Sequence, residues 1–226
     1  MGRQRNRRVS LDYYQEIPFL TLTGQALDRD GRGIANASIR VHARSFTDTL
    51  QADASGRYAL QLPKDTILGI DVYAKGYFLE TQMVKVQPQA SESLTITLPK
   101  ADVGAVADIA NLYFVGDMAV LLPRSEPELP RVKRFMEVNP HLKVEIAGHV
   151  NYPNTPPVPQ TSDEWDLSVR RARLVYDYLL SAGIPAAQLT YQGYGNHEMR
   201  FPRARSSEQQ AANRRVEIRV VGELED

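Results

Sequence analysis

The feature that most constrains this chain is a change in its hydrophobic pattern at Pro99-Lys100. Before that point, short runs such as residues 38–44 and 94–98 alternate between apolar and polar side chains, which is typical of half-buried β-strands. After that point, segments with helical spacing of apolar residues alternate with short strands. A chain of 226 residues is long enough for two compact units. We therefore expect two domains, residues 17–100 and 111–226, with a basic arm at 1–16 and a linker at 101–110.

The first domain is expected to be all-β. Roughly six or seven short strands separated by turn signals are typical of a β-sandwich. Four segments resemble the carboxypeptidase regulatory-like domain, a transthyretin-like sandwich, and these are residues 23–26, 30–37, 54–60 and 74–77. The resemblance implies a structural or interaction module without chemistry of its own, with an envelope protein as its expected partner. His42 lies on the polar face of its strand, where we expect it to face solvent.

The second domain is expected to be a layered α/β unit of βαβαβ type, with helices on a mixed sheet. Ser125 and Glu128 have the spacing of a capping box, which predicts a helix that begins there and ends at Asn139-Pro140. A longer helix is predicted before Gly183, a residue typical of a helix C-terminus. This longer helix is predicted at 163–182, and a short helix at 207–213. Strands are predicted at 111–115, 143–146, 189–192 and 215–221.

Four segments of this second half, in order, resemble the OmpA-like C-terminal peptidoglycan-binding family: residues 144–149, 167–172, 193–195 and 213–218. The resemblance implies non-covalent binding of the diaminopimelate residue in the peptide stem of peptidoglycan. In the family, an aspartate in the loop after a Gly-His pair receives the ligand's ammonium group, and the arginine of a Leu-Ser-x-x-Arg-Ala motif takes its carboxylate. A planar guanidinium suits a carboxylate because two parallel hydrogen bonds fix its orientation.

The motif makes Arg171 the carboxylate-binding residue, and helical periodicity supports that choice. At about 100° per residue, an apolar stripe runs through Ala172, Val175, Tyr176 and Leu179, and Arg171 lies beside it. The neighbouring arginines at 170 and 173 project away from the stripe and are expected to be solvated.

The sequence departs from the family at the other half of the clamp. The family continues Gly-His-Thr-Asp, whereas this chain has Gly148-His149-Val150-Asn151, so a neutral amide replaces the carboxylate. Affinity should fall, because an amide lacks the Coulomb attraction of the carboxylate. The loop that follows is longer than the family's and rich in proline. A carboxylate near its end, Glu164 or the acidic residues at 163 and 166, is hypothesised to replace the lost charge.

Four further residues belong to the expected site or its border. Val150 and Leu167 occupy motif positions in the loop and at the opening of the long helix, and Asp117 follows the first predicted strand. Arg215 begins the last strand and points away from its apolar face, where it can contact ligand. A structural salt bridge made by Arg214 or Arg215 is the equal alternative.

Other functions are disfavoured by the sequence. The formal net charge of zero offers no general attraction to nucleic acid. The four histidines lack metal-ligand spacing and no nucleophile motif is present, so we expect no enzyme activity, no metal and no cofactor.

We expect a protein of the periplasm, associated with the outer membrane, that tethers an envelope assembly to the cell wall. Because cysteine is absent and no apolar run reaches the roughly 20 residues of a membrane span, a membrane anchor is expected outside this chain. The alternative is a scaffold domain of a secretion or motility complex with a degenerate peptidoglycan pocket.

Overall fold

A computed structural model describes residues 19–43, 46–86 and 94–224 of the chain. The basic arm expected at residues 1–16 lies outside these ranges. In the described residues, no helix combines the length and the apolar character needed to cross a membrane.

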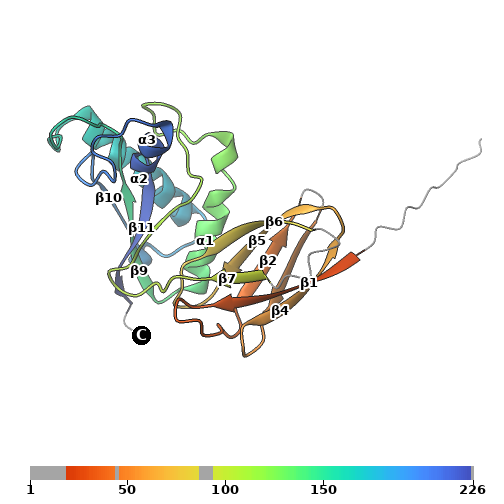
Figure 1. Cartoon of the computed structure of the whole chain (residues 1–226). Helices are drawn as coiled ribbons and strands as arrows, with labels where there is room; N and C mark the ends of the chain where they lie inside the picture. Colours follow the sequence, from red (N-terminus) through yellow and green to blue (C-terminus); the bar gives the residue numbers. More distant parts are fainter. Residues whose placement is uncertain (1–18, 44–45, 87–93, 225–226) are drawn as a thin grey trace, which may run out of the picture.

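The first domain is a β-sandwich, as the sequence predicted (Figure 1). One sheet has the order β4-β1-β7 and the other β3-β2-β5-β6. Alternating side chains of both sheets, among them Leu22, Ile39, Leu60 and Ile70, enclose a single apolar core. The strands are β1 (Phe19–Leu27), β2 (Ser38–His42), β3 (Thr47–Gln51), β4 (Arg57–Pro63), β5 (Ile67–Tyr73), β6 (Glu80–Lys85) and β7 (Leu94–Thr97).

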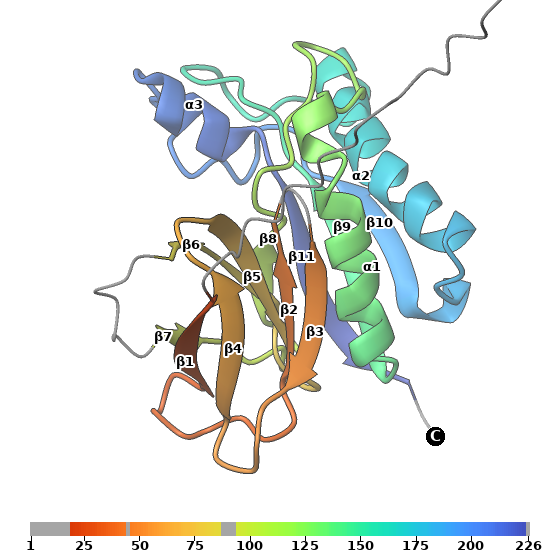
Figure 2. The ribbon, with the colours of Figure 1, turned by 90° about the vertical axis from the view of Figure 1, so that its right-hand side faces the viewer.

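The second domain is the expected α/β layer. Its sheet has the order β10-β9-β11-β8, with β10 parallel to β9 and β11 antiparallel to both of its neighbours. Helices α1 and α2 cover one face of this sheet (Figure 2). Val144, Val216 and Ile218 belong to the apolar core that these elements share. The elements are β8 (Val106–Asp108), η1 (Pro123–Ser125), α1 (Glu128–Val138), β9 (Leu142–Gly148), α2 (Asp163–Ser181), η2 (Ala186–Gln188), β10 (Leu189–Gly193), α3 (Ser207–Asn213) and β11 (Val216–Glu223).

The start of this domain differs from the prediction. Residues 106–108, expected in a linker, form the edge strand β8, in which Ala107 lies opposite Ile218 of β11. The strand expected at 111–115 is absent from the described structure, where Phe114 only bridges Leu121. The chain turns out of the sheet at Asn111, whose φ of 56° is incompatible with an extended strand.

The capping-box prediction was also wrong. Helix α1 begins at Glu128 behind Pro127, and no side chain caps it. Ser125 is instead fully buried, where its hydroxyl donates to the carbonyl of Asn111 and accepts from the amide of Tyr113, both at 2.7 Å. Two backbone groups of a distant loop outcompete the helix end for this side chain.

A buried junction joins the two domains. Asp71 on β5 is 2% exposed and lies 3.3 Å from the guanidinium of Arg131 on α1. His42 contacts both, with one ring nitrogen 3.4 Å from Asp71 and the other 2.8 Å from Arg131, so the expectation of a solvent-facing histidine was wrong. Phe78 stacks on Phe135 of α1 with ring centroids 5.5 Å apart and belongs to the second domain's core.

Candidate functional site

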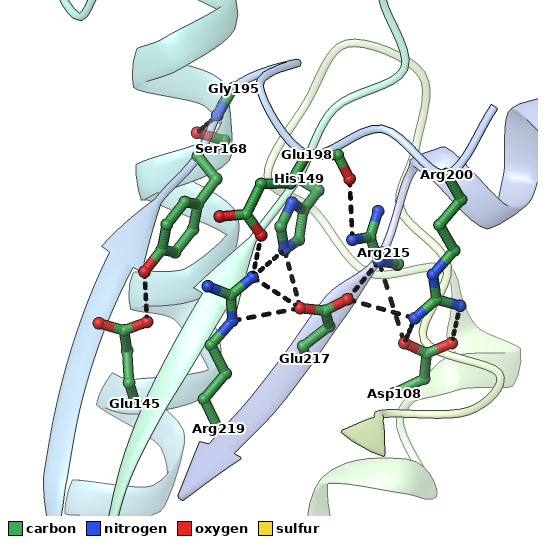
Figure 3. Close-up of polar contacts among 11 residues, drawn as sticks. Asp108, Glu145, His149, Ser168, Gly195, Glu198, Arg200, Arg215, Glu217 and Arg219 are labelled. Atoms are coloured by element: carbon green, nitrogen blue, oxygen red, sulfur yellow. Dashed lines mark hydrogen bonds and ion pairs between the residues drawn. The ribbon is translucent and has the colours of Figure 1, made fainter. Parts of the chain in front are cut away.

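The first half of helix α2 lies directly against the ends of β9 and β10. A side chain on Gly148 would overlap the carbonyl of Ser168, and one on Gly193 would overlap the Ser168 hydroxyl. That hydroxyl accepts a hydrogen bond from the amide of Gly195 at 2.9 Å (Figure 3). The Gly-His, Leu-Ser and Gly-Tyr-Gly motifs are therefore parts of one contact that fixes the position of α2.

This placement buries Arg171, which is only 2% exposed. Its Nε donates to the carbonyl of Met118 at 3.2 Å, and its guanidinium lies 4.8 Å from the ring centroid of Phe114. Within the described chain, no carboxylate forms an ion pair with it. Burial, and then the positive charge of Arg214, lower the pKa of Arg171 to about 10, while Asp117 acts in the opposite direction. Among the residues that the structure describes, Arg171 is thus a buried cation without a paired anion.

A pocket of about 260 Å³ opens beside Arg171. Arg214 follows helix α3, and Arg124 stacks on Tyr113 at 4.4 Å, so three guanidinium groups line one small space. The other lining residues are Tyr113, Phe114, Leu122, Ser207 and Ala211. The arrangement is suited to a carboxylate or another small anion, since a guanidinium forms its strongest hydrogen bonds with charged oxygens.

Asn151 is linked to this region through Asn213. The side-chain oxygen of Asn151 accepts from the amide nitrogen of Asn213 at 2.9 Å, and Asn213 directly precedes Arg214. Asp117 is exposed in a turn with a φ of 53°, next to Met118, which binds Arg171.

The other expected site residues have different roles. Val150 and Leu167 are buried, and the amide of Val150 donates to the carbonyl of Gly195, so both belong to the frame around the loop. Glu164 is half-buried on the first turn of α2, where it forms no ion pair within the described residues. Asp166 forms an ion pair with Arg170, in which a carboxylate oxygen lies 2.7 Å from Nε.

Models of two known families match the two halves of the chain. Residues 113–214 match the model of the OmpA family, and residues 21–99 match that of the carboxypeptidase regulatory-like domain. The chain joins a carboxypeptidase regulatory-like domain to an OmpA-family domain. Both resemblances predicted from the sequence are confirmed.

Several solved structures are similar to part of the chain. The periplasmic domain of Helicobacter pylori MotB is 21% identical, with 50% of this chain and 71% of that chain covered and a TM-score of 0.42. A putative MotB-like protein from Desulfovibrio vulgaris is 29% identical, with coverage of 50% and 71% and a TM-score of 0.41. The cell wall anchor of the T6SS from Pseudomonas aeruginosa is 28% identical, with coverage of 52% and 79% and a TM-score of 0.40. No curated protein matches the chain.

Arg215 lies away from the Arg171 pocket of the OmpA-family domain. Its Nε bonds to Glu217 at 2.6 Å, so of the two alternatives for this residue the structure has the salt bridge (Figure 3). Glu217 also meets His149 at 3.2 Å and Arg219 at 2.9 Å. Sequence reasoning missed two arginines that line the pocket: Arg124, and Arg214, which immediately precedes Arg215.

This ion network has strong electrostatic effects. Burial would raise the pKa of Glu217, but hydrogen bonds from His149, Arg215 and Arg219 outweigh it and hold that pKa far below its usual range. Burial lowers the pKa of His149, which keeps the ring neutral. His149, Glu198 and Glu217 have ligand atoms within 4.8 Å of one another. The arginines bonded to these carboxylates already neutralise them, so the arrangement is poorly suited to a metal ion.

Asn196 of the OmpA-family domain forms several hydrogen bonds to the proline-rich loop. The Asn196 side chain accepts from the amide of Val158 at 2.8 Å and donates to the carbonyls of Tyr152 and Pro156. His197 contacts the Val158 carbonyl at 2.7 Å and meets Trp165 edge-on. The long loop is therefore tied to the β10–α3 connection.

Proposed function

We propose that the OmpA-family domain binds peptidoglycan without covalent chemistry, through the diaminopimelate residue of the stem peptide. One observation carries this proposal: Arg171 is buried in a pocket with two further arginines and has no paired carboxylate among the described residues. A buried unpaired charge is costly to the folded state. An anionic ligand that enters the pocket would compensate that cost.

The free carboxylate of diaminopimelate would form an ion pair with the guanidinium of Arg171. The ammonium group beside that carboxylate needs a hydrogen-bond acceptor. Asn151 can supply a carbonyl oxygen from the loop beyond Val150. Asp117 can supply a negative charge, since it already acts on Arg171. Leu167, which is buried near the start of α2, would support this site through its packing.

Glu164 is less well placed than Asp117 to replace the family aspartate. It precedes Arg171 by two helical turns, which separates their backbones by about 10 Å along the axis. The ammonium and carboxylate that form the recognised end of diaminopimelate share one carbon atom. We therefore expect Asp117→Asn to weaken binding more than Glu164→Gln or Asp163→Asn, and unchanged affinity in these last two variants would remove the Glu164 hypothesis.

The decisive experiment compares two soluble stem peptides by calorimetric titration of the full chain. One contains diaminopimelate, and the other contains lysine, which lacks only the extra carboxylate. The diaminopimelate peptide should bind more tightly, and Arg171→Ala should abolish the difference by weakening binding about 10-fold or more. Arg173→Ala is the matched control, because Arg173 lies on the same helix with a 62% exposed side chain. Equal affinity of the wild type for both peptides would contradict the proposal.

At the level of the cell, we propose a periplasmic tether of an outer-membrane or envelope assembly, with the sandwich as a spacer or docking domain. The replacement of the family aspartate by Asn151 favours a second candidate, a scaffold domain of an envelope complex whose pocket has degenerated. Purified sacculi separate the two. Retention that Arg171→Ala abolishes supports the tether, whereas absence of retention supports the scaffold.

A further inference from the structure

A second cavity, of about 400 Å³, lies at the junction of the two domains. Residues of strand β6 of the sandwich and of strand β8 and helix α1 of the OmpA-family domain line it. None of its lining residues belongs to the Arg171 pocket. The two sites are therefore physically separate.

The floor of this junction cavity is apolar and continuous with the second domain's core. Phe78, Ile109, Val132, Phe135 and Ile218 line it, and each of them is a buried member of that core. A single water occupies about 30 Å³ in the liquid, so the cavity is much larger than a solvent site needs. Its volume and its position between domains are typical of ligand sites.

The rim of the cavity carries three carboxylates, of which one is left without an ion pair among the described residues. Glu80, Asp108 and Glu128 line it against the single cation Arg131. Asp108 is bonded to Arg200, and Glu128 is bonded to Arg131. Glu80 has no ion pair within the described part of the chain. Burial raises the pKa of its carboxyl, while the positive charge of Arg29 acts in the opposite direction. The site thus offers a partly desolvated carboxylate beside an apolar space.

Two sheet edges border the same cavity. Strand β6 is outermost in its sheet, and β8 is outermost in the other. An edge strand presents backbone donors and acceptors that an extended peptide can pair with. Met83 on β6 adds an apolar side chain at the rim, where it is 65% exposed.

We propose that the junction cavity is a docking site for an extended segment of a partner protein, in which a large apolar side chain fills the cavity and an adjacent lysine or arginine meets Glu80. The apolar floor accommodates the first group, the acidic rim selects the second, and a sheet edge holds the backbone between them. Through this site, a partner would contact both domains at once.

Panning of a displayed library of random nonapeptides against the full chain tests the proposal. Enriched peptides should share a large apolar residue beside a basic one, and synthetic copies are then titrated against variants. Ala107→Phe, which fills the cavity from β8, should weaken binding at least 10-fold, and Glu80→Gln by about the same factor. Glu126→Gln removes a carboxylate outside the cavity and should have no effect.

A charge swap at one exposed position keeps the test valid if Ala107→Phe fails to fold. Met83→Arg should lower the affinity for the basic peptides, and Met83→Glu should raise it. Failure to enrich any peptide, enrichment without a basic residue, or unchanged binding in the Glu80→Gln and Met83→Arg variants would overturn the proposal. Removal of residues 1–16 is a further test. A rise of 10-fold or more in the affinity for the peptides would overturn the proposal, because the chain's own basic arm would then be the occupant of the cavity. Retention on sacculi should be the same in the Met83 variants and the wild type.

Discussion

Glu217 and Arg171 are both buried charges, but their surroundings differ. Glu217 is 4% exposed and bonded to His149, Arg215 and Arg219. Within the described ranges, the guanidinium of Arg171 bonds to one carbonyl oxygen and lies against the face of one ring. A buried charge stabilises the fold only when its partners offset the loss of hydration. We therefore expect Glu217 to support the fold and Arg171 to cost stability in the absence of ligand.

Replacement of Glu217 by glutamine should destabilise the OmpA-family domain by about 3 kcal/mol, because several cations would lose their buried counter-charge. Urea denaturation at neutral pH measures this. Asp166→Asn is the control, since the Asp166–Arg170 pair is largely exposed and should contribute under about 1 kcal/mol. Equal effects of the two substitutions would show that the network adds no stability beyond a surface pair.

Acidification should destabilise the protein in two stages. The pKa of His149 is lowered in the fold by burial, so its contribution is present above the unfolded pKa of about 6.5 and is lost as pH falls below it. The pKa of Glu217 is also lowered, and its contribution is lost below about pH 4.3. Unfolding free energies measured across pH 3 to 8 should fall in that order. In Glu217→Gln, the decline below about pH 4.3 should be shallower.

Arg171→Met should raise the unfolding free energy of the unliganded protein by about 1 kcal/mol, because an apolar side chain of similar length removes an uncompensated buried charge. The same variant should lose retention on sacculi. Thermal unfolding and the pull-down are measured on one preparation. A clear loss of stability would instead assign Arg171 a structural role.

At the scale of elements, Ser125 and Ser162 separate two roles that one residue type can have. The side chain of Ser162 caps α2 by accepting from the amide of Trp165, whereas Ser125 binds two backbone groups of a distant loop. Loss of an exposed cap costs about 1 kcal/mol. Two buried groups left unpaired cost about 1–3 kcal/mol each. Ser125→Ala should therefore destabilise the protein more than Ser162→Ala does, and it should increase hydrogen exchange at residues 111–118. Equal losses of unfolding free energy in the two variants would contradict this.

The same contrast explains which elements the sequence predicts. Helix α2 carries its cap, its apolar stripe and the terminating Gly183 in one continuous segment, so local pattern suffices. Strand β8 has three residues and no pattern of its own, and it exists because β11 offers an unpaired edge. The position of Arg171 beside the apolar stripe of α2 was predictable because a helix fixes which residues are neighbours. Arg214 and Arg215 are adjacent, and only the start of β11 decides which one lines the pocket.

At the scale of the whole molecule, the domain junction is invisible in the sequence because its partners are far apart along the chain. Asp71, Arg131 and His42 are each ordinary polar residues of their own element. Their juxtaposition depends on how the outer face of the sheet β3-β2-β5-β6 meets α1. The junction excludes water from Asp71, which Thr81 also binds at 2.7 Å. We infer that the two domains unfold as one unit.

Phe78 offers the strongest test of that coupling, because it belongs to the sandwich's sequence but is buried in the core of the OmpA-family domain. Phe78→Ala should cost about 3 kcal/mol, the usual loss for a buried aromatic side chain. Calorimetry should show one transition for the wild type and two for Phe78→Ala, because the interface that couples the domains has been weakened. Leu60→Ala is the matched control: it empties the sandwich core, away from the junction, and should lower stability without splitting the transition. Two transitions in the wild type would mean that the sandwich is an independent spacer.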